Sequence, residues 1–338
     1  LKWETTKQTD FGVDFGFFNQ RLTGSFDYYY KKTNDILVQT PYIAAMGEGG
    51  EPWVNGASMN NQGVEFTVSF KSDPSSEFQW AVSANIGTYK TELTDLPSNV
   101  INKYAGDGVH DLILGRSPNS AYGLVADGIF KTQEEVDAHA DQPGKAVGRI
   151  RYKDLDGDGV INETYDRTWI GCYDPDFFGG LNFDFAYKGF DLNLFFEGMF
   201  GNDVNSDWKK ESDIWLFTNP AWKNHATRML GGWSPDNPNS DIPAISNNTA
   251  NQEQRFSSWF IEDGSYIKLR NIELGYTFPT KLIKKMHMSN LRLYAAAYNV
   301  FTLKKFWGDD KYTSFDPERP SYHYLTPFTF NFGINVSF

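Results

Sequence analysis

The C-terminal stretch FTFNFGINVSF alternates strictly between apolar and small polar side chains. One face would carry Phe328, Phe330, Phe332, Ile334, Val336 and Phe338, and the other Thr329, Asn331, Gly333, Asn335 and Ser337. A period of two sustained over so many residues predicts a β-strand rather than a helix. The same alternation recurs in VEFTVSF (64–70), LNFDFAY (181–187), FDLNLFF (190–196) and IELGYTF (272–278). The chain is therefore expected to be all-β.

The aromatic content narrows the class of β-protein. Phe, Tyr and Trp make up 17% of the 338 residues, more than the core of one soluble domain usually needs. Such an excess fits a very large aromatic core, or a β-barrel with aromatic girdles at two membrane interfaces. In a soluble sandwich the apolar strand faces would meet a second sheet, whereas in a barrel they would meet lipid. No apolar run approaches the roughly 18 residues of a membrane helix.

The lengths of the connections favour the barrel. Nine strands are predicted, at 8–19, 22–38, 60–71, 77–89, 176–187, 189–200, 264–278, 290–302 and 327–338. The long connections between them are 40–59, 90–175, 202–256 and 303–326. If the last strand ends in the periplasm, every short turn falls on the periplasmic side and every long loop falls outside. Outer-membrane barrels have this asymmetry.

Nine is an odd number, and an open sheet would leave two unpaired edges. Bacterial single-chain barrels have even strand numbers, and unpaired edges are not tolerated in a membrane. The chain is therefore expected to be the C-terminal portion of a larger transmembrane barrel. The remaining strands would lie upstream of Leu1 or in another chain.

Several segments together resemble a known family. Asn331, Gly333, Val336 and Phe338 resemble the C-terminal signal by which outer-membrane barrels are recognised for insertion. RYKDLDGDGVIN (151–162), YKGFDLNLFFEGMFGND (187–203), YIKLRNIELGYTFP (266–279) and LRLYAAAYNVFTL (291–303) occur in this order before it. Taken together, these segments resemble the C-terminal half of SusC-like TonB-dependent transporters, and the resemblance runs from near residue 8 to the end.

The resemblance implies a barrel of about 22 strands, preceded by a plug domain that is absent from this chain. It implies a location in the cell outer membrane and the import of large nutrients, mostly oligosaccharides and in some members peptides. The implied partners are a SusD-like surface lipoprotein, the missing N-terminal barrel and plug portion, and TonB, which that portion would contact. A dimer of transporter–lipoprotein pairs is also compatible with the resemblance.

Two other classes of function remain to be weighed. One is a structural or adhesin-type outer-membrane β-protein without transport activity. The other is a soluble carbohydrate-active enzyme, but no acid/base pair can be nominated: Glu134 and Glu135 lie in KTQEEVDAHA, which predicts a short solvated helix. We expect no enzyme. Nucleic acid is disfavoured by the net charge of -12, and Cys172 is the single cysteine.

The stretch DLDGDGVIN (154–162) is similar to a calcium-binding loop. Asp154, Asp156 and Asp158 fill the first, third and fifth ligand positions, and Val160 would offer its carbonyl at the seventh. The twelfth position holds Tyr165 instead of a bidentate acid, and Asp166 follows one residue later. Flanking helices are not predicted, so a helix–loop–helix sensor is disfavoured. We expect a structural Ca²⁺ or Mg²⁺ bound by the four aspartates and Val160, the alternative being an Asp/Gly-rich turn without an ion.

Aromatic rings in the loops are the remaining candidates. Trp53, Trp215, Trp222, Trp233 and Trp307 are predicted outside the strands. Flat apolar rings beside polar groups suit sugar faces and protein interfaces, although loop packing is an alternative use for them. We single out Trp215 and Trp222 as expected contacts of the ligand or of the SusD-like lipoprotein, which would cover the barrel as a lid. The five histidines have no partner at helical spacing, and no metal is expected there.

Overall fold

One antiparallel sheet dominates the molecule. The structure, a computed structural model, describes residues 1–40, 52–101, 112–214, 225–246, 250, 252–304, 313–320 and 324–338. Within them, a nine-stranded sheet has the order β1-β2-β3-β4-β9-β10-β13-β14-β15. Its strands are β1 (Thr5–Phe17), β2 (Leu22–Gln39), β3 (Trp53–Lys71), β4 (Phe78–Asp95), β9 (Phe177–Tyr187), β10 (Phe190–Phe200), β13 (Tyr266–Thr277), β14 (Asn290–Lys304) and β15 (Thr329–Ser337). The prediction of an all-β chain with nine antiparallel strands is confirmed.

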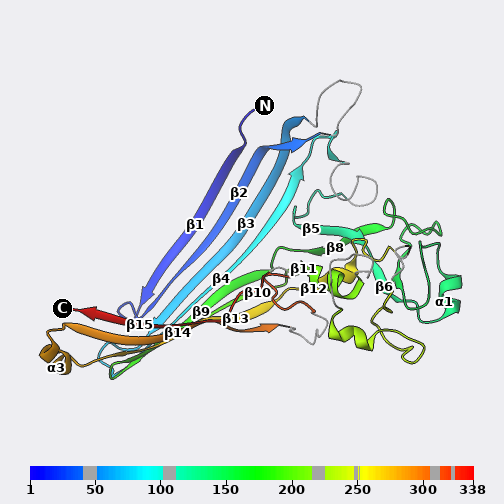
Figure 1. Cartoon of the computed structure of the whole chain (residues 1–338). Helices are drawn as coiled ribbons and strands as arrows, with labels where there is room; N and C mark the ends of the chain where they lie inside the picture. Colours follow the sequence, from blue (N-terminus) through cyan, green and yellow to red (C-terminus); the bar gives the residue numbers. More distant parts are fainter. Residues whose placement is uncertain are drawn as a thin grey trace.

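Short and long connections separate at the two ends of this sheet. The short ones are 18–21, 72–77, 188–189 and 278–289, and the long ones are 40–52, 96–176, 201–265 and 305–328. Figure 1 shows the described parts of the long connections gathered at one end of the strands, with β1 and β15 at the two edges. At Lys188 and Gly189 both φ angles are positive, 49° and 90°, as a two-residue hairpin requires.

Two strands extend further than the alternation indicated. β3 begins at Trp53, which pairs with Gln39, and β4 ends at Asp95, which pairs with Ser58. The expected loops 40–59 and 90–175 are therefore too long at these ends, and Trp53 lies in a strand. The alternation stops here because these strand ends extend beyond the part of the sheet that has an apolar environment on one face and a polar one on the other. The backbone pairing continues there, but the side chains need not alternate.

The register gives the sheet one apolar and one polar face. Phe332 pairs with Ala295 and Phe330 with Ala297, whereas Asn331 pairs with Ala296 on the opposite face. Side chains of the apolar face remain open: Phe332 is 83% exposed and Leu274 is 52% exposed. A sheet with such exposed apolar side chains on one face needs an apolar surrounding.

The described parts of the long connections form smaller elements. Three two-stranded sheets pair β5 (Ser120–Leu124) with β8 (Arg167–Cys172), β6 (Ala126–Ile129) with β7 (Ile150–Tyr152) and β11 (Asp203–Asn205) with β12 (Ile261–Asp263). Short helical turns are α1 (Gln133–Ala138), α2 (Asp207–Lys209), η3 (Lys210–Ile214), η4 (Thr227–Gly231) and η6 (Ser258–Phe260). α1 confirms the predicted helix, and the Thr132 side chain caps it by accepting from the backbone N–H of Glu135.

The buried core lies in these connections and at the strand ends that adjoin them. One cluster comprises Leu124, Ile129, Ile150, Tyr152, Ile161, Ile214 and Phe260. A second comprises Val38, Ala57, Leu93, Leu96, Val100 and Ile113. The second cluster joins the extended ends of β2, β3 and β4 to the following connection, so the loop region rests on the end of the sheet. No helix among the described residues is long and apolar enough to cross a membrane.

Candidate functional site

A ladder of amide and carboxylate side chains crosses the polar face. Asn193 of β10 donates to Asn182 at 2.9 Å and to Asp184 at 2.7 Å, both on β9. Its own side-chain oxygen accepts from Asn271 of β13 at 3.0 Å. The ladder forms because the register places these side chains on one face of three adjacent strands. It presents a polar, hydrogen-bonding wall.

Hydroxyl groups continue this wall across the neighbouring strands. The Ser25 and Thr67 hydroxyls lie 2.8 Å apart, and Ser83 donates to Ser69 at 2.9 Å. A shallow hollow of about 290 Å³ lies among these side chains, with Asn85 and Asn182 also on its border. Its lining is uncharged and carries both donors and acceptors, which suits a neutral polar ligand.

An arginine crosses the polar face near the end with the short turns. Arg292 of β14 donates to Glu273 of β13 at 2.7 Å and, through Nε, to Asp191 of β10 at 3.0 Å. It reaches Asp191 across Gly275, where an added Cβ would overlap both charged groups. Gly275 is thus required for this three-strand bridge. One guanidinium holding two carboxylates stiffens the sheet across β10, β13 and β14.

A buried lysine attaches the last long connection to the other end of the polar face. Lys268 of β13 is 2% exposed, and its amine donates to both carboxylate oxygens of Asp316 at 3.2 Å and to Glu318. Arg270 pairs with Glu197 of β10 at 2.7 Å and also with Glu318. Residues 313–320 therefore fold back against the polar face instead of projecting away. This loop therefore covers part of the polar face, and ionic contacts hold it there.

A second buried lysine joins three segments that belong to two of the long connections. Lys209 donates to the Trp259 carbonyl at 2.6 Å and lies 3.6 Å from a carboxylate oxygen of Glu262. Burial lowers the pKa of Lys209, and the Glu262 charge opposes this shift. Glu262 in turn accepts from the backbone and side chain of Thr313. Residues 207–214, 257–263 and 313–316 thus form one connected rim.

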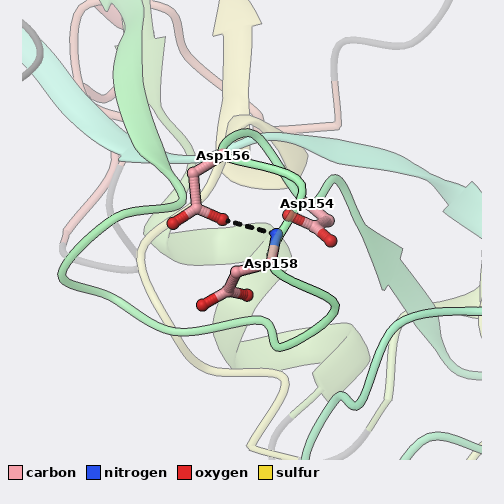
Figure 2. Close-up of side chains that lie close together, drawn as sticks. All are labelled: Asp154, Asp156 and Asp158. Atoms are coloured by element: carbon pink, nitrogen blue, oxygen red, sulfur yellow. Dashed lines mark hydrogen bonds between the residues drawn. The ribbon is translucent and has the colours of Figure 1, made fainter.

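The aspartate loop has the compact geometry of a cation-binding turn. Ligand oxygens of Asp154, Asp156 and Asp158 lie within 4.8 Å of one another. Figure 2 shows the three side chains projecting from one loop, with the Asp158 backbone N–H donating to Asp156 at 3.1 Å. Asp154 accepts from Gly157 and Gly159 at 2.7 and 2.9 Å. Burial acts to raise the pKa of Asp154, but these bonds outweigh it and hold the pKa below its ordinary value.

Asp166 has a different place from the other three aspartates. It is 0% exposed, and its two carboxylate oxygens accept from the backbone of Leu155 at 2.8 Å and of Asn162 at 2.7 Å. The structure therefore does not bring Asp166 into the cluster of three, and uses it to close the loop. Val160 points its backbone N–H at Asp158, 2.7 Å away. Tyr165, at the twelfth position, is 45% exposed.

The other sequence candidates are scattered. Trp215 and Trp222 lie outside the described residues, as does Trp307, while Trp233 packs against the first core cluster. Among the histidines, His225 bonds to the Ser212 carbonyl at 2.8 Å, and burial lowers the pKa of His139. These two histidines take part in loop packing.

The ionic attachment of residues 313–320 was missed by the sequence reasoning. The signal available was the pair Lys268 and Arg270 in YIKLRNIELGY, two cations in an otherwise alternating strand. Their acidic partners Asp316 and Glu318 are far away in the chain, in a connection without periodicity. A cation at a polar-face position of a strand demands a counter-charge, and that rule would have indicated a folded-back loop.

Comparison with known proteins identifies what this wall belongs to. The model of the "TonB dependent receptor-like, beta-barrel" family matches residues 1–300. TonB-dependent receptor P3 of Formosa agariphila is 32% identical over the whole chain, which covers 34% of that protein. TonB-dependent receptor SusC of Bacteroides thetaiotaomicron is 27% identical, and the chain covers 32% of it. The solved structure of the RagAB peptide transporter superposes with a TM-score of 0.77 at 25% identity, covering all of this chain and 36% of that one.

The chain thus spans about a third of the length of the relatives it matches. The nine strands correspond to part of a larger outer-membrane barrel, so the apolar face meets lipid and the polar face lines the lumen. Outer-membrane barrels have short periplasmic turns and long extracellular connections, and this is the orientation that we propose for the chain. Receptors of this family are not enzymes. The chain belongs to the TonB-dependent receptor-like β-barrel family, in its SusC- and RagA-like branch.

Proposed function

We propose that this chain forms part of the wall of a TonB-dependent importer that carries large polar nutrients across the outer membrane. The observation that carries the proposal is the two-faced sheet: an uncovered apolar face and a hydrogen-bonding lumenal face, closed at its outer end by packed loops. Energy coupling requires the remainder of the protein, with a plug and a segment that contacts TonB. An adhesin or a structural barrel would not need the loop that Lys268 holds against the lumenal wall.

Oligosaccharides are the cargo that the lumenal wall favours most. Its middle part carries serine, threonine and asparagine side chains around the hollow of about 290 Å³. Sugars present neighbouring hydroxyls, and such a mixture of donors and acceptors can bind them without a charged partner. Oligopeptides are the second candidate. The similarity to the RagAB peptide transporter supports them, and backbone amides of a peptide could use the same groups.

A surface lipoprotein is the proposed partner at the extracellular end. The RagAB structures are of a two-part peptide importer, and SusC is a relative. In this proposal a SusD-like lipoprotein covers the lumen and contacts the extracellular connections. Trp215 and Trp222 remain the proposed contacts of ligand or lid, since both follow the rim residues 207–214 in the chain.

The aspartate loop is proposed as a structural cation site on the extracellular side. Three carboxylates within 4.8 Å need a counter-charge, and oxygen ligands of this kind prefer Ca²⁺, with Mg²⁺ as the alternative. Asp154, Asp156, Asp158 and the Val160 carbonyl would hold the ion. Asp166 would support the loop from behind through its two backbone bonds instead of closing the coordination sphere.

Uptake by cells tests the proposed transport. A strain lacking the full-length gene is complemented with the wild type, and the uptake of labelled oligosaccharides and oligopeptides is measured with and without an energised inner membrane. We expect energy-dependent uptake of one of the two cargo classes. Trp215→Ala and Trp222→Ala should reduce it. If complementation restores surface adhesion but restores the uptake of neither cargo class, the result favours the adhesin-type alternative and rejects the importer.

A further inference from the structure

The periplasmic turn between β13 and β14 differs from the rest of this acidic chain. Residues 279–289, PTKLIKKMHMS, contain Lys281, Lys284 and Lys285 and no acid, whereas the whole chain has a net charge of -12. The turn folds as α3 (Thr280–Ile283) followed by η7 (Lys284–Met286). Ile283 packs inward at 2% exposure, while Leu282 is 63% and Met286 is 60% exposed. Cationic side chains and exposed apolar side chains therefore lie together on the surface of one short segment.

Basic residues of the other periplasmic turns are already paired. Arg21 lies 3.7 Å from Asp73, and Lys188 lies 3.1 Å from Glu77. Lys281, Lys284 and Lys285 are exposed, and none of the described residues gives them an ion-pair partner. Their counter-charge is therefore expected outside the chain.

The turn adjoins the lipid-facing surface directly. Tyr276 and Phe278 on the apolar face have ring centroids 5.0 Å apart, and Tyr276 also contacts Phe190 at 4.6 Å. Ser289 at the end of the turn donates to the Ser337 carbonyl at 2.7 Å, which places the turn beside the C-terminal residue, Phe338, 89% exposed. Aromatic rings of a barrel gather at the level of the headgroups. Figure 1 shows α3 at this end of the sheet, opposite the loops.

We propose that residues 279–289 form a membrane-interface anchor that binds anionic phospholipid of the periplasmic leaflet. Leu282 and Met286 insert between headgroups, and the three lysines reach the phosphates around them. The combination of exposed apolar and cationic side chains on a short helical segment suits this interface. Long lysine stems can cover apolar surface while their amines contact phosphate. This inference rests on the membrane orientation of the barrel and is independent of the cargo.

Depth-dependent fluorescence quenching tests the anchor in the full-length protein. A fluorophore is attached to Leu282→Cys, in a background in which Cys172 is replaced by Ser. The control probe is attached to Ser76→Cys on another periplasmic turn. The protein is placed in nanodiscs of phosphatidylethanolamine, alone or mixed with phosphatidylglycerol, one lipid at a time being brominated. Heat-modifiable migration confirms that each barrel is folded.

We expect the probe at position 282, but not that at 76, to be quenched by brominated lipid. Brominated phosphatidylglycerol should quench it about threefold more than brominated phosphatidylethanolamine at equal content, since the three exposed lysines attract anionic headgroups. Lys281→Gln, Lys284→Gln and Lys285→Gln together should remove this ratio, whereas Lys188→Gln should retain it. A probe at 282 as exposed to water as that at 76 would overturn the proposal. A quenching ratio unchanged by the three glutamines would also overturn it.

Discussion

Arg149 and Glu253 form a salt bridge of 2.8 Å although each side chain is only 6% exposed. Arg149 also donates to the Ala244 carbonyl, and Glu253 also accepts from the Ile150 backbone at 2.8 Å. Burial raises the pKa of Glu253, while the charge of Arg149 and the bonds to it act in the opposite direction. The pair connects two extracellular connections that are distant in the chain, so the loop region acts as one unit above the lumen.

Removing one partner of this pair should loosen the loop region. Glu253→Ala would leave a buried, unpaired guanidinium, which typically costs about 3–5 kcal/mol. The joint replacement Arg149→Met with Glu253→Leu should cost much less, because no charge stays buried. Hydrogen exchange of the Ala244 amide, which donates to the Gly148 carbonyl at 2.9 Å and so joins the same two connections, measures the effect in the full-length protein. Equal acceleration in the single and the double replacement would show that the ionic contact is not what holds the loops.

Substitutions in the aspartate loop should affect ion binding and loop folding separately. Asp156→Asn changes an exposed ligand and should weaken Ca²⁺ binding while leaving the loop intact. Asp166→Asn replaces one buried acceptor by a donor facing a backbone N–H, and should destabilise the loop by about 1–3 kcal/mol. Terbium luminescence reports the ion, and protease cleavage within 154–162 reports the loop. Binding that survives Asp156→Asn unchanged, or a melt insensitive to chelator, would contradict the proposed site.

Neighbouring residues of β15 should respond oppositely to a charge. Phe332 faces lipid, and Phe332→Arg should destabilise the barrel by roughly 2–4 kcal/mol if it lies near the bilayer midplane. Asn331→Arg places the same side chain in the lumen and should be tolerated. The fraction of heat-modifiable, folded barrel in outer-membrane preparations measures both. Similar losses for the two variants would argue against the assigned faces.

Asp203 makes the loop region sensitive to pH. Burial raises the pKa of Asp203, and the charges of Asp263 and Asp176 add to this, while the Cys172 N–H opposes it. A folded-state pKa above the ordinary value means that protonation favours the fold. Its stabilising contribution is complete below the ordinary value and is lost as the pH rises through the raised one.

Asp203→Asn should therefore stabilise the contact with β8 at neutral pH and remove this dependence. The amide oxygen can still accept from Cys172, now without a buried charge. Exchange of the Cys172 amide, compared between variant and wild type at the same pH, should be slower in the variant at neutral pH and equal well below the ordinary aspartate pKa. Faster exchange in the variant at neutral pH would refute the argument.

Most of the sheet could be predicted from the sequence because lipid and lumen impose a period of two. Phe330, Asn331 and Phe332 illustrate this selection. Where β3 and β4 continue beyond that environment, the period disappears, and pairs such as Trp53 with Gln39 were not foreseen. Ionic contacts such as Lys268 with Asp316 join residues distant in the chain, and no local pattern marks them. For the same reason, the use of Asp166 as a loop closure instead of a ligand could not be read from its spacing.

Cysteine accessibility along β4 tests the central claim, that this sheet is a transport wall with lumen on one face and lipid on the other. Asn85 and Ile86 are adjacent and both exposed, on opposite faces. In full-length protein with Cys172 replaced by Ser, a water-soluble maleimide should label Asn85→Cys and not Ile86→Cys, and a bulky maleimide on Asn85→Cys should block uptake. Equal labelling of both positions, or uptake unaffected by a fully labelled Asn85→Cys, would contradict the account.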